Sequence, residues 1–238
     1  MHRLDKILVD TGRYTRSEAK RLIAQGQVLV NGRVVRQAAE KFDRSAVELF
    51  VSGQHLTSEA FVYLMMNKPA GVLSATRDGR GETVLDLLPP HYTKMGLFPV
   101  GRLDKDSEGL LLLTNNGQLA HELLHPKRHV EKRYYVEVDG QLDSRDTAAF
   151  AGGMTMLSGE VFLPAGLELL EKSSAAIVVL REGKYHQIKR MLGSLGKPVI
   201  YLKRLSMGTL VLDESLATGN FRHLTEAERE NILFQQRG

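Results

Sequence analysis

The segment from Gly101 to Gly117, GRLDKDSEGLLLLTNNG, places the tightest restriction on how this 238-residue chain can fold. A short charged run ends where the apolar run Leu110–Leu113 begins, and Asn115–Gly117 closes the segment. An apolar run bounded by turn residues predicts a buried strand, so the charged run is predicted to be a loop held by that strand. Such loops often present catalytic side chains. Charged surface loops are common, so the pattern alone favours an Asp104 that simply solvates a turn or caps a segment.

Composition sets wide limits. Hydrophobic residues make up 42% and charged residues 25% of the chain, which is typical of a soluble globular protein of one or two domains. The net charge of +4 permits an RNA partner without requiring one. The absence of cysteine excludes disulfides, thiolate zinc sites and cysteine nucleophiles. No apolar run approaches the roughly 18 residues of a membrane span, and we expect a cytoplasmic protein with no membrane partner.

The first 58 residues predict a small separate module of two helices and a hairpin. Thr15 and Glu18 have the spacing of a capping box for the second helix, and Asn31-Gly32 is a strong hairpin signal. The apolar residues at helical spacing are Leu4, Ile7 and Leu8 in the first helix and Ala19, Leu22 and Ile23 in the second. A polar stretch at residues 52–60 predicts the domain boundary, which gives domains of residues 1–58 and 59–238.

The second domain is predicted to alternate strands and helices. Its most basic segment, Arg181–Arg204, has seven Lys or Arg residues against one acid, and it would form either a solvated face or a binding face. A capping box at Thr225 and Glu228 predicts a final helix. The other predicted elements are strands at Phe61–Met66, Tyr134–Val138, Val161–Leu170 and Ala175–Leu180, and helices at Gln118–His125, Asp143–Gly153 and around Ile188–Leu195.

A competing site lies at His121–His125, which matches H-E-x-x-H, the zinc-binding pattern of metalloproteases. Pro126 would end the helix directly after the second histidine, and no further G-x-x-H follows. We therefore expect no metal site here.

Four motifs occur in the order that a known family has them. They are N-K-P-x-G-V at residues 67–72, G-R-L-D at 101–104, K-x-Y at 132–134 and G-K-Y-H-Q-I-K-R-M-L at 183–192. Together they resemble the RsuA family of pseudouridine synthases, in the branch that modifies ribosomal RNA. The resemblance implies that Asp104 is the catalytic nucleophile, that Lys189 pairs with it and that Tyr134 stacks on the target uracil. It implies that Arg102 helps to hold the RNA where the base has left, and it gives His186 no role beyond a structural one.

The N-terminal module is similar to the S4 RNA-binding domain. The matching strings are RLDKIL at residues 3–8, SEAKRLIAQGQV at 17–28 and VNG at 30–32. The resemblance implies an α+β chain, with a small S4 (αL) domain followed by a catalytic domain built on a large mixed, mainly antiparallel sheet with flanking helices. It also implies contacts with RNA phosphates through Arg3, Lys6, Arg16, Lys20 and Arg21, although a charged helix face is more often simply solvated.

The reaction implied by the resemblance breaks the N1–C1′ bond of a uridine and rejoins the base through C5, with no metal or organic cofactor. Asp104 must be ionised to act, and a nearby cation such as Lys189 favours that form. The sequence leaves open attack at C1′, attack at C6 or a glycal route. We expect a monomer acting on ribosomal RNA, free or in a pre-ribosomal particle. A short chain without a basic tail favours 16S small-subunit rRNA, the alternatives being 23S rRNA or a non-catalytic RNA-binding or ribosome-assembly protein.

Overall fold

The computed structural model describes residues 1–9, 11, 14–43, 47–56, 61–90, 92, 95–125 and 128–234, the side chain of Phe234 excepted. These residues form two compact units. The first comprises Met1–Val62, Leu88–Phe98 and Thr114–Asn116, and the second comprises Tyr63–Leu87, Pro99–Leu113 and Gly117–Gly238. The domain boundary predicted between residues 58 and 59 lies outside the described residues and stays a prediction. No helix in the described ranges is long and apolar enough to cross a membrane.

In its described residues up to Leu56, the first unit contains two helices and two small sheets. Its helices are α1 (Leu4–Val9) and α2 (Arg16–Ala24). One sheet has the order β3-β2-β5-β6, and β1 pairs with β4 in the other. The strands are β1 (His2–Arg3), β2 (Val28–Val30), β3 (Arg33–Val34), β4 (Lys41–Phe42), β5 (Leu49–Val51) and β6 (Gln54–Leu56). The predicted apolar faces of both helices pack into one core with β2 and β5.

Local signals explain this unit well. The predicted capping box is present, because Thr15 Oγ1 accepts from the Glu18 N–H and the Glu18 carboxylate accepts from the Thr15 N–H. Asn31 and Gly32 have φ values of 50° and 76°, as the two central residues of a tight hairpin turn require. The predicted helix and hairpin are therefore confirmed.

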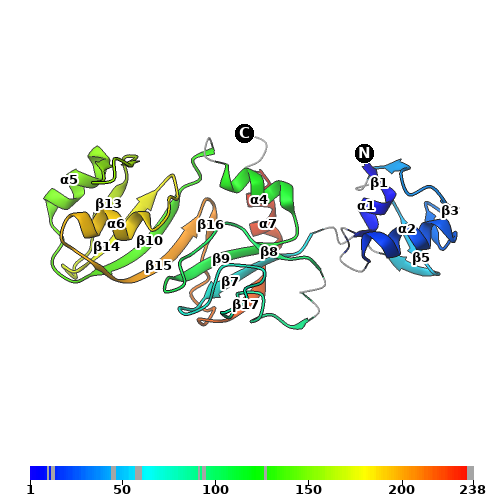
Figure 1. The fold of residues 1–238 in the computed structure, drawn as a ribbon, viewed down its shortest axis with the longest axis horizontal. Helices are drawn as coiled ribbons and strands as arrows, with labels where there is room; N and C mark the ends of the chain where they lie inside the picture. Colours follow the sequence, from blue (N-terminus) through cyan, green and yellow to red (C-terminus); the bar gives the residue numbers. More distant parts are fainter. Residues whose placement is uncertain are drawn as a thin grey trace. The chain divides into compact units, whose positions relative to one another are not determined.

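The second unit is built on one large sheet of mixed, mostly antiparallel strands, which Figure 1 shows running through the unit. Its order is β13-β14-β10-β15-β9-β7-β17, with β16 paired to β15 and β8 paired to β9. The strands are β7 (Tyr63–Lys68), β8 (Phe98–Pro99), β9 (Glu108–Thr114), β10 (Lys132–Val138), β13 (Gly166–Leu169), β14 (Ala175–Leu180), β15 (Val199–Met207), β16 (Leu210–Val211) and β17 (Phe221–His223); β11 (Met154–Thr155) and β12 (Val161–Phe162) form a separate pair.

Four helices flank this sheet in the described part of the unit: α4 (Gly117–Leu124), α5 (Ser144–Gly152), α6 (Gln187–Ser194) and α7 (Glu226–Phe234). Phe150 of α5 and the apolar face of α6, led by Met191, pack against β10, β14 and β15 in one hydrophobic cluster. In Figure 1, α5 and α6 lie by this part of the sheet, and α4 and α7 lie toward β9 and β7. The α+β class with a large mixed sheet is confirmed.

Two predictions of local structure need correction. The single strand predicted over Val161–Leu170 is two strands, β12 and β13, separated by a segment that contains Pro164, which cannot donate a ladder hydrogen bond. The long strand β15 was not predicted at all. Its buried side chains alternate as Leu202, Arg204 and Ser206, so a cation interrupts the apolar pattern that marks a strand.

Gly109 permits the close approach of β9 and β15. It pairs with Arg204 in a parallel register and has a φ of 100°. A Cβ at this position would lie 2.3 Å from the backbone oxygen of Arg204, so no other residue fits without backbone movement. The glycine that follows the charged loop is therefore needed to join the loop to the sheet.

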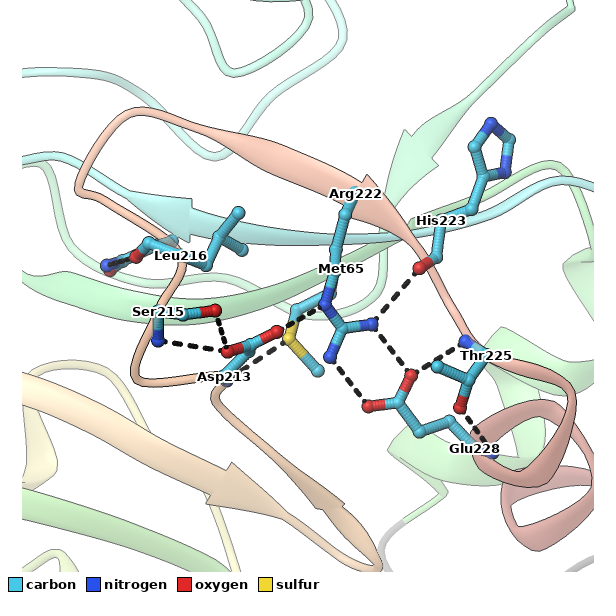
Figure 2. A network of polar contacts seen from close by, with 9 residues as sticks. Met65, Asp213, Ser215, Leu216, Arg222, His223, Thr225 and Glu228 are labelled. Atoms are coloured by element: carbon cyan, nitrogen blue, oxygen red, sulfur yellow. Dashed lines mark hydrogen bonds and ion pairs between the residues drawn. The ribbon is translucent and has the colours of Figure 1, made fainter.

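A closed ionic network ties β17 to α7 and to the segment after β16, as Figure 2 shows. Arg222 Nε donates to Asp213 at 2.7 Å, and its two Nη atoms donate to the Glu228 carboxylate at 2.8 Å each. Glu228 also accepts from the Thr225 N–H at 2.8 Å, which confirms the predicted capping box. Ser215 supplies two further hydrogen bonds to Asp213. The arginine is thus balanced by two carboxylates, which are themselves hydrogen-bonded.

Candidate functional site

The backbone of the loop between β8 and β9 is held from inside by one lysine. Lys68, at the end of β7, has no exposed surface, and its Nζ lies within hydrogen-bond distance of four carbonyl oxygens. Three of them belong to the loop, at Asp104 (3.1 Å), Lys105 (3.3 Å) and Ser107 (2.8 Å). Burial lowers the pKa of Lys68 to about 8, although carboxylates of the loop oppose the shift. This role has no local sequence signal, because the three loop carbonyls lie 36 to 39 positions away.

A second clamp holds the residue before Asp104. The Ser74 hydroxyl donates to the Leu103 carbonyl at 3.0 Å and accepts from the Leu103 N–H at 3.1 Å. The Gly71 N–H donates to the Lys105 carbonyl at 2.7 Å. The N-K-P-x-G-V segment and the residues that follow it therefore fix the backbone on both sides of Asp104.

The Asp104 carboxylate lies beside a lysine from α6. Lys189 Nζ is 3.2 Å from Asp104 Oδ2 and 2.5 Å from Asp106 Oδ1. Burial works against the charge of Lys189, but the hydrogen bonds to Asp106 and Asp104 prevail and raise its pKa. The same contact lowers the pKa of Asp106. Lys189 is therefore a stable cation between two carboxylates, one a quarter exposed and the other three-quarters exposed.

His186 faces the same carboxylate. Its Nε2 lies 3.5 Å from Asp104 Oδ1, and its ring stacks on Tyr185 at a centroid distance of 3.8 Å. The residue precedes α6 with a φ of 49°, a left-handed conformation that is uncommon outside glycine and is often found at functional sites. The family resemblance implies only a structural role for His186, whereas its side chain lies beside the candidate nucleophile.

A pocket with a cavity volume of about 70 Å³ opens at this point, and Asp104, Lys189 and His186 line it. Tyr134 of β10 and Arg102 of the loop complete the wall, with apolar support from Leu103, Leu180, Ile188 and Leu202. Tyr134 is 8% exposed and belongs to the core cluster, so its ring is held in place. Arg102 is exposed, and no carboxylate pairs with it within the described ranges. The structure thus brings all four predicted site residues to one pocket.

A second pocket, of about 350 Å³, shares Arg102 and Tyr134 with the first. Lys132 and Arg204 line it, and neither was singled out for a role in the sequence analysis. The Lys132 Nζ donates to the Val130 carbonyl at 3.0 Å, and Arg204 Nε donates to the Leu110 carbonyl at 2.7 Å. Burial and the nearby Arg204 lower the pKa of Lys132 to about 8. The register that brings Arg204 opposite Tyr134 could not be read without β15.

The five residues predicted to contact RNA in the first unit do not have the same environment. Arg16, Lys20 and Arg21 lie exposed on α2, away from its buried Ala19 and Ile23, and Lys6 is exposed on α1. Arg3 is already paired, since its guanidinium donates to the Asp5 carboxylate at 3.0 and 2.8 Å. The charge of Arg3 is therefore already balanced in part by a neighbouring carboxylate.

The H-E-x-x-H string does not lie on one continuous helix. Helix α4 ends at Leu124, so His125 lies beyond its last turn, and Pro126 lies outside the described residues. The two imidazole rings meet edge to face with centroids 5.4 Å apart. Across the described ranges, no group of three or more histidines and carboxylates is arranged to hold a metal ion.

Comparison with known proteins separates the chain into two matched parts. Residues 62–194 match the RNA pseudouridylate synthase family, and residues 2–47 match the S4 domain. A solved crystal structure of a pseudouridylate synthase superposes with a TM-score of 0.69 at 35% identity, covering 98% of this chain and 100% of that one. The fold of an S4 domain followed by a pseudouridine synthase domain is thereby confirmed.

Relatives of similar length extend the match over nearly the whole chain. The uncharacterized RNA pseudouridine synthase YtzG of Bacillus subtilis is 46% identical, with 95% of this chain and 96% of that protein covered. The ribosomal small subunit pseudouridine synthase A of Vibrio cholerae is 39% identical, with 97% and 99% covered. The corresponding protein of Haemophilus influenzae is 37% identical, with 97% and 99% covered.

Proposed function

The chain belongs to the RNA pseudouridylate synthase family, and we propose that it converts one uridine of 16S small-subunit ribosomal RNA to pseudouridine. The observation that carries the proposal is the Asp104 carboxylate, held by its backbone and 3.2 Å from Lys189 in a pocket that Tyr134 also lines. The choice of the small subunit draws on the relatives that are named for that substrate.

Each side chain has a distinct task in this reaction. Asp104 is the nucleophile, and Lys189, 3.2 Å away, orients it for attack. Tyr134 stacks on the uracil ring after the base has left its helix, a step that costs roughly a few kcal/mol. Arg102, an exposed residue of the pocket wall, holds the strand from which the base has departed. The N1–C1′ bond breaks, a C5–C1′ bond forms, and the C5 proton is exchanged for one on N1. Atoms and oxidation state are conserved, and no cofactor is needed.

Mapping of pseudouridine in ribosomal RNA tests the proposal. Cells that lack the protein are complemented with wild type, Asp104→Asn or the matched control Asp106→Asn, since both carboxylates touch Lys189 but Asp106 is largely exposed. We expect one 16S pseudouridine to vanish and to return with wild type and Asp106→Asn only. A lost site in 23S rRNA would move the substrate to the other subunit. No lost site would leave a non-catalytic RNA-binding or assembly protein, and full rescue by Asp104→Asn would remove the nucleophile.

The S4 domain is proposed to hold the ribosomal RNA through the exposed cations Arg16, Lys20 and Arg21, with Lys6 and Arg3 in support. We place the boundary between the two domains at residues 58 and 59. All four residues proposed for the reaction lie in one unit of one chain, and we therefore propose a cytoplasmic monomer that acts on free rRNA or a pre-ribosomal particle.

Affinity measured against salt tests the S4 domain in the full chain. Replacing Arg16, Lys20 and Arg21 by glutamine should weaken binding to transcribed 16S rRNA and lower the slope of log affinity against log salt by about three. The control is Lys172→Gln, which removes a cation that pairs with Glu137 in the other unit. An unchanged slope in the triple variant would take RNA binding away from α2.

A further inference from the structure

Arg204 is a buried cation and Lys132 a half-buried one, and neither has an acidic partner in the described part of the chain. Arg204 is 2% exposed, and its Nη2 is buried without any hydrogen-bond acceptor. The Lys132 ammonium has one carbonyl acceptor and can donate two more hydrogen bonds. Buried charges are normally paired, because an isolated one loses its hydration without compensation. Lys132 and Arg204 therefore need a counter-charge that the described part of the protein does not provide.

The acids around the second pocket are already engaged. Glu182, which lines the pocket, accepts from the Leu163 N–H and from Gln187 Nε2, and it lies 3.9 Å from Lys184. Glu131 pairs with Arg181 at 3.5 Å. The charged lining is thus strongly positive, with Glu182 set against Arg102, Lys132, Arg181, Lys184 and Arg204. A cavity of about 350 Å³ lies within the usual range for a small-ligand site.

We propose that this second pocket binds a phosphate group of the RNA strand next to the target nucleotide, with Lys132 and Arg204 as its counter-charge. The choice of RNA as the source of the phosphate rests on the function proposed above. Three placements favour it. Tyr134 and Arg102 line both pockets, Lys132 lies two residues before Tyr134 on the same face of β10, and Arg204 pairs with Tyr134 across the sheet. A base stacked on Tyr134 therefore carries a neighbouring phosphate toward these two cations.

The first test measures the affinity of full-length protein for unmodified, transcribed 16S rRNA as a function of KCl concentration. Lys132→Met should bind about tenfold more weakly, with a salt slope lower by about one, and Lys132→Arg should restore both. Arg204→Lys keeps the charge but loses the guanidinium geometry, and it should weaken binding less than Lys132→Met. The matched control is Arg133→Met, whose side chain lies on the other face of β10 and pairs with Glu168. It should leave affinity and slope unchanged.

A purely structural Lys132 would give a different pattern. Lys132→Met would then lower the melting temperature while the salt slope remained that of wild type, and this result would overturn the proposal. The proposal would also be overturned if Lys132→Met bound the RNA with the same affinity as the Arg133→Met control.

The second test separates the RNA phosphate from free phosphate. Short RNAs that carry the mapped uridine are made with a neutral methylphosphonate at one neighbouring linkage. One such substitution should weaken wild type but not Lys132→Met. Binding of inorganic phosphate that depends on Lys132, together with additive effects for every methylphosphonate, would assign the pocket to free phosphate and overturn the proposal.

Failure of the phosphate site is distinct from failure of the enzyme. If pseudouridine forms while the salt slope ignores Lys132, the phosphate site is wrong and the enzyme stands. If no pseudouridine forms in any rRNA but the slope depends on Lys132, the phosphate site is supported in a protein that only binds RNA, and transcribed 16S rRNA measures it directly.

Discussion

Two arginines of the second unit have opposite electrostatic surroundings. Arg222 lies between Asp213 and Glu228. Each of its three guanidinium nitrogens donates a hydrogen bond of 2.7 to 2.8 Å to one of these two carboxylates. Arg204 is more deeply buried, and among the described residues it makes one hydrogen bond, from Nε to a backbone carbonyl, while Nη2 has no acceptor. The first arrangement is complete within the protein and holds β17 to α7. The second is incomplete, which is the state expected of a group that waits for an anionic ligand.

Lys189 combines the two situations, because it is paired with Asp104 and Asp106 and also lines the pocket. Replacing it tests whether a cation that is balanced within the protein can still be needed for activity. Lys189→Met leaves two carboxylates without their cation, and we expect pseudouridine formation to fall by about 10² to 10³-fold. Single-turnover kinetics on a defined RNA measures this. Lys189→Arg is the matched control and should retain most activity. A Lys189→Met enzyme with the wild-type rate would mean that pairing here is only structural.

Arg222→Met should break the complete network and behave as a stability variant. Two partly buried carboxylates lose their partner, and we expect the free energy of unfolding to fall by about 2 kcal/mol, discounted for the partial exposure of all three side chains. Denaturant unfolding gives the value. The rate per folded molecule should stay at the wild-type level, and a large loss of rate without a loss of stability would contradict the comparison.

The pH dependence of stability sharpens the same contrast. Hydrogen bonds from Ser215 and Arg222 lower the pKa of Asp213, and those from Arg222 above all lower the pKa of Glu228. Carboxylates with a lowered pKa in the folded state contribute stability above their unfolded pKa, and this contribution disappears as the pH falls through the folded value. Melting temperatures measured from pH 6 down to about 3 should therefore fall more steeply for wild type than for Arg222→Met, and parallel curves would show that the network contributes nothing.

Ser74→Ala removes uncharged hydrogen bonds and should have the smallest effect of these substitutions. The Ser74 hydroxyl makes two hydrogen bonds to the Leu103 backbone, and losing them should cost about 1 kcal/mol and a few-fold in rate, because the loop before Asp104 loosens. Ser74→Thr, which keeps the hydroxyl, is the control. If Ser74→Ala reduced the rate as much as Lys189→Met, then positioning rather than charge would dominate the site.

The parts of the fold that were predictable are those encoded by neighbouring residues. The capping boxes at Thr15 and Thr225 and the turn at Asn31-Gly32 depend on contacts within a few positions, and the structure has all three. The sheet in the second unit depends on distant contacts instead. Strand β15 was missed because Arg204 occupies a position on its buried face where a pattern of strand burial requires an apolar residue.

The candidate site divides in the same way. Asp104, Lys189, Tyr134 and Arg102 were named from motifs of a known family, and nothing in periodicity or composition would have brought them together. The role of Lys68 in holding the loop was not predicted, because its acceptors are backbone carbonyls, which have no sequence signal. The pocket role of Lys132 was not predicted, because it depends on Arg204, which lies on a strand that the sequence pattern did not indicate.

The pairing of Gly109 with Arg204 also has a consequence for the order in which the site can form during synthesis. Arg204 follows Leu110, its hydrogen-bond partner, by 94 positions. At about 5 to 20 residues per second, the ribosome completes the Asp104 loop roughly 5 to 20 s before it supplies the strand that the loop rests on. Lys189, which contacts Asp104, is synthesised shortly before β15. A nascent chain that ends before α6 therefore carries a finished loop without the strand and the lysine that complete the site.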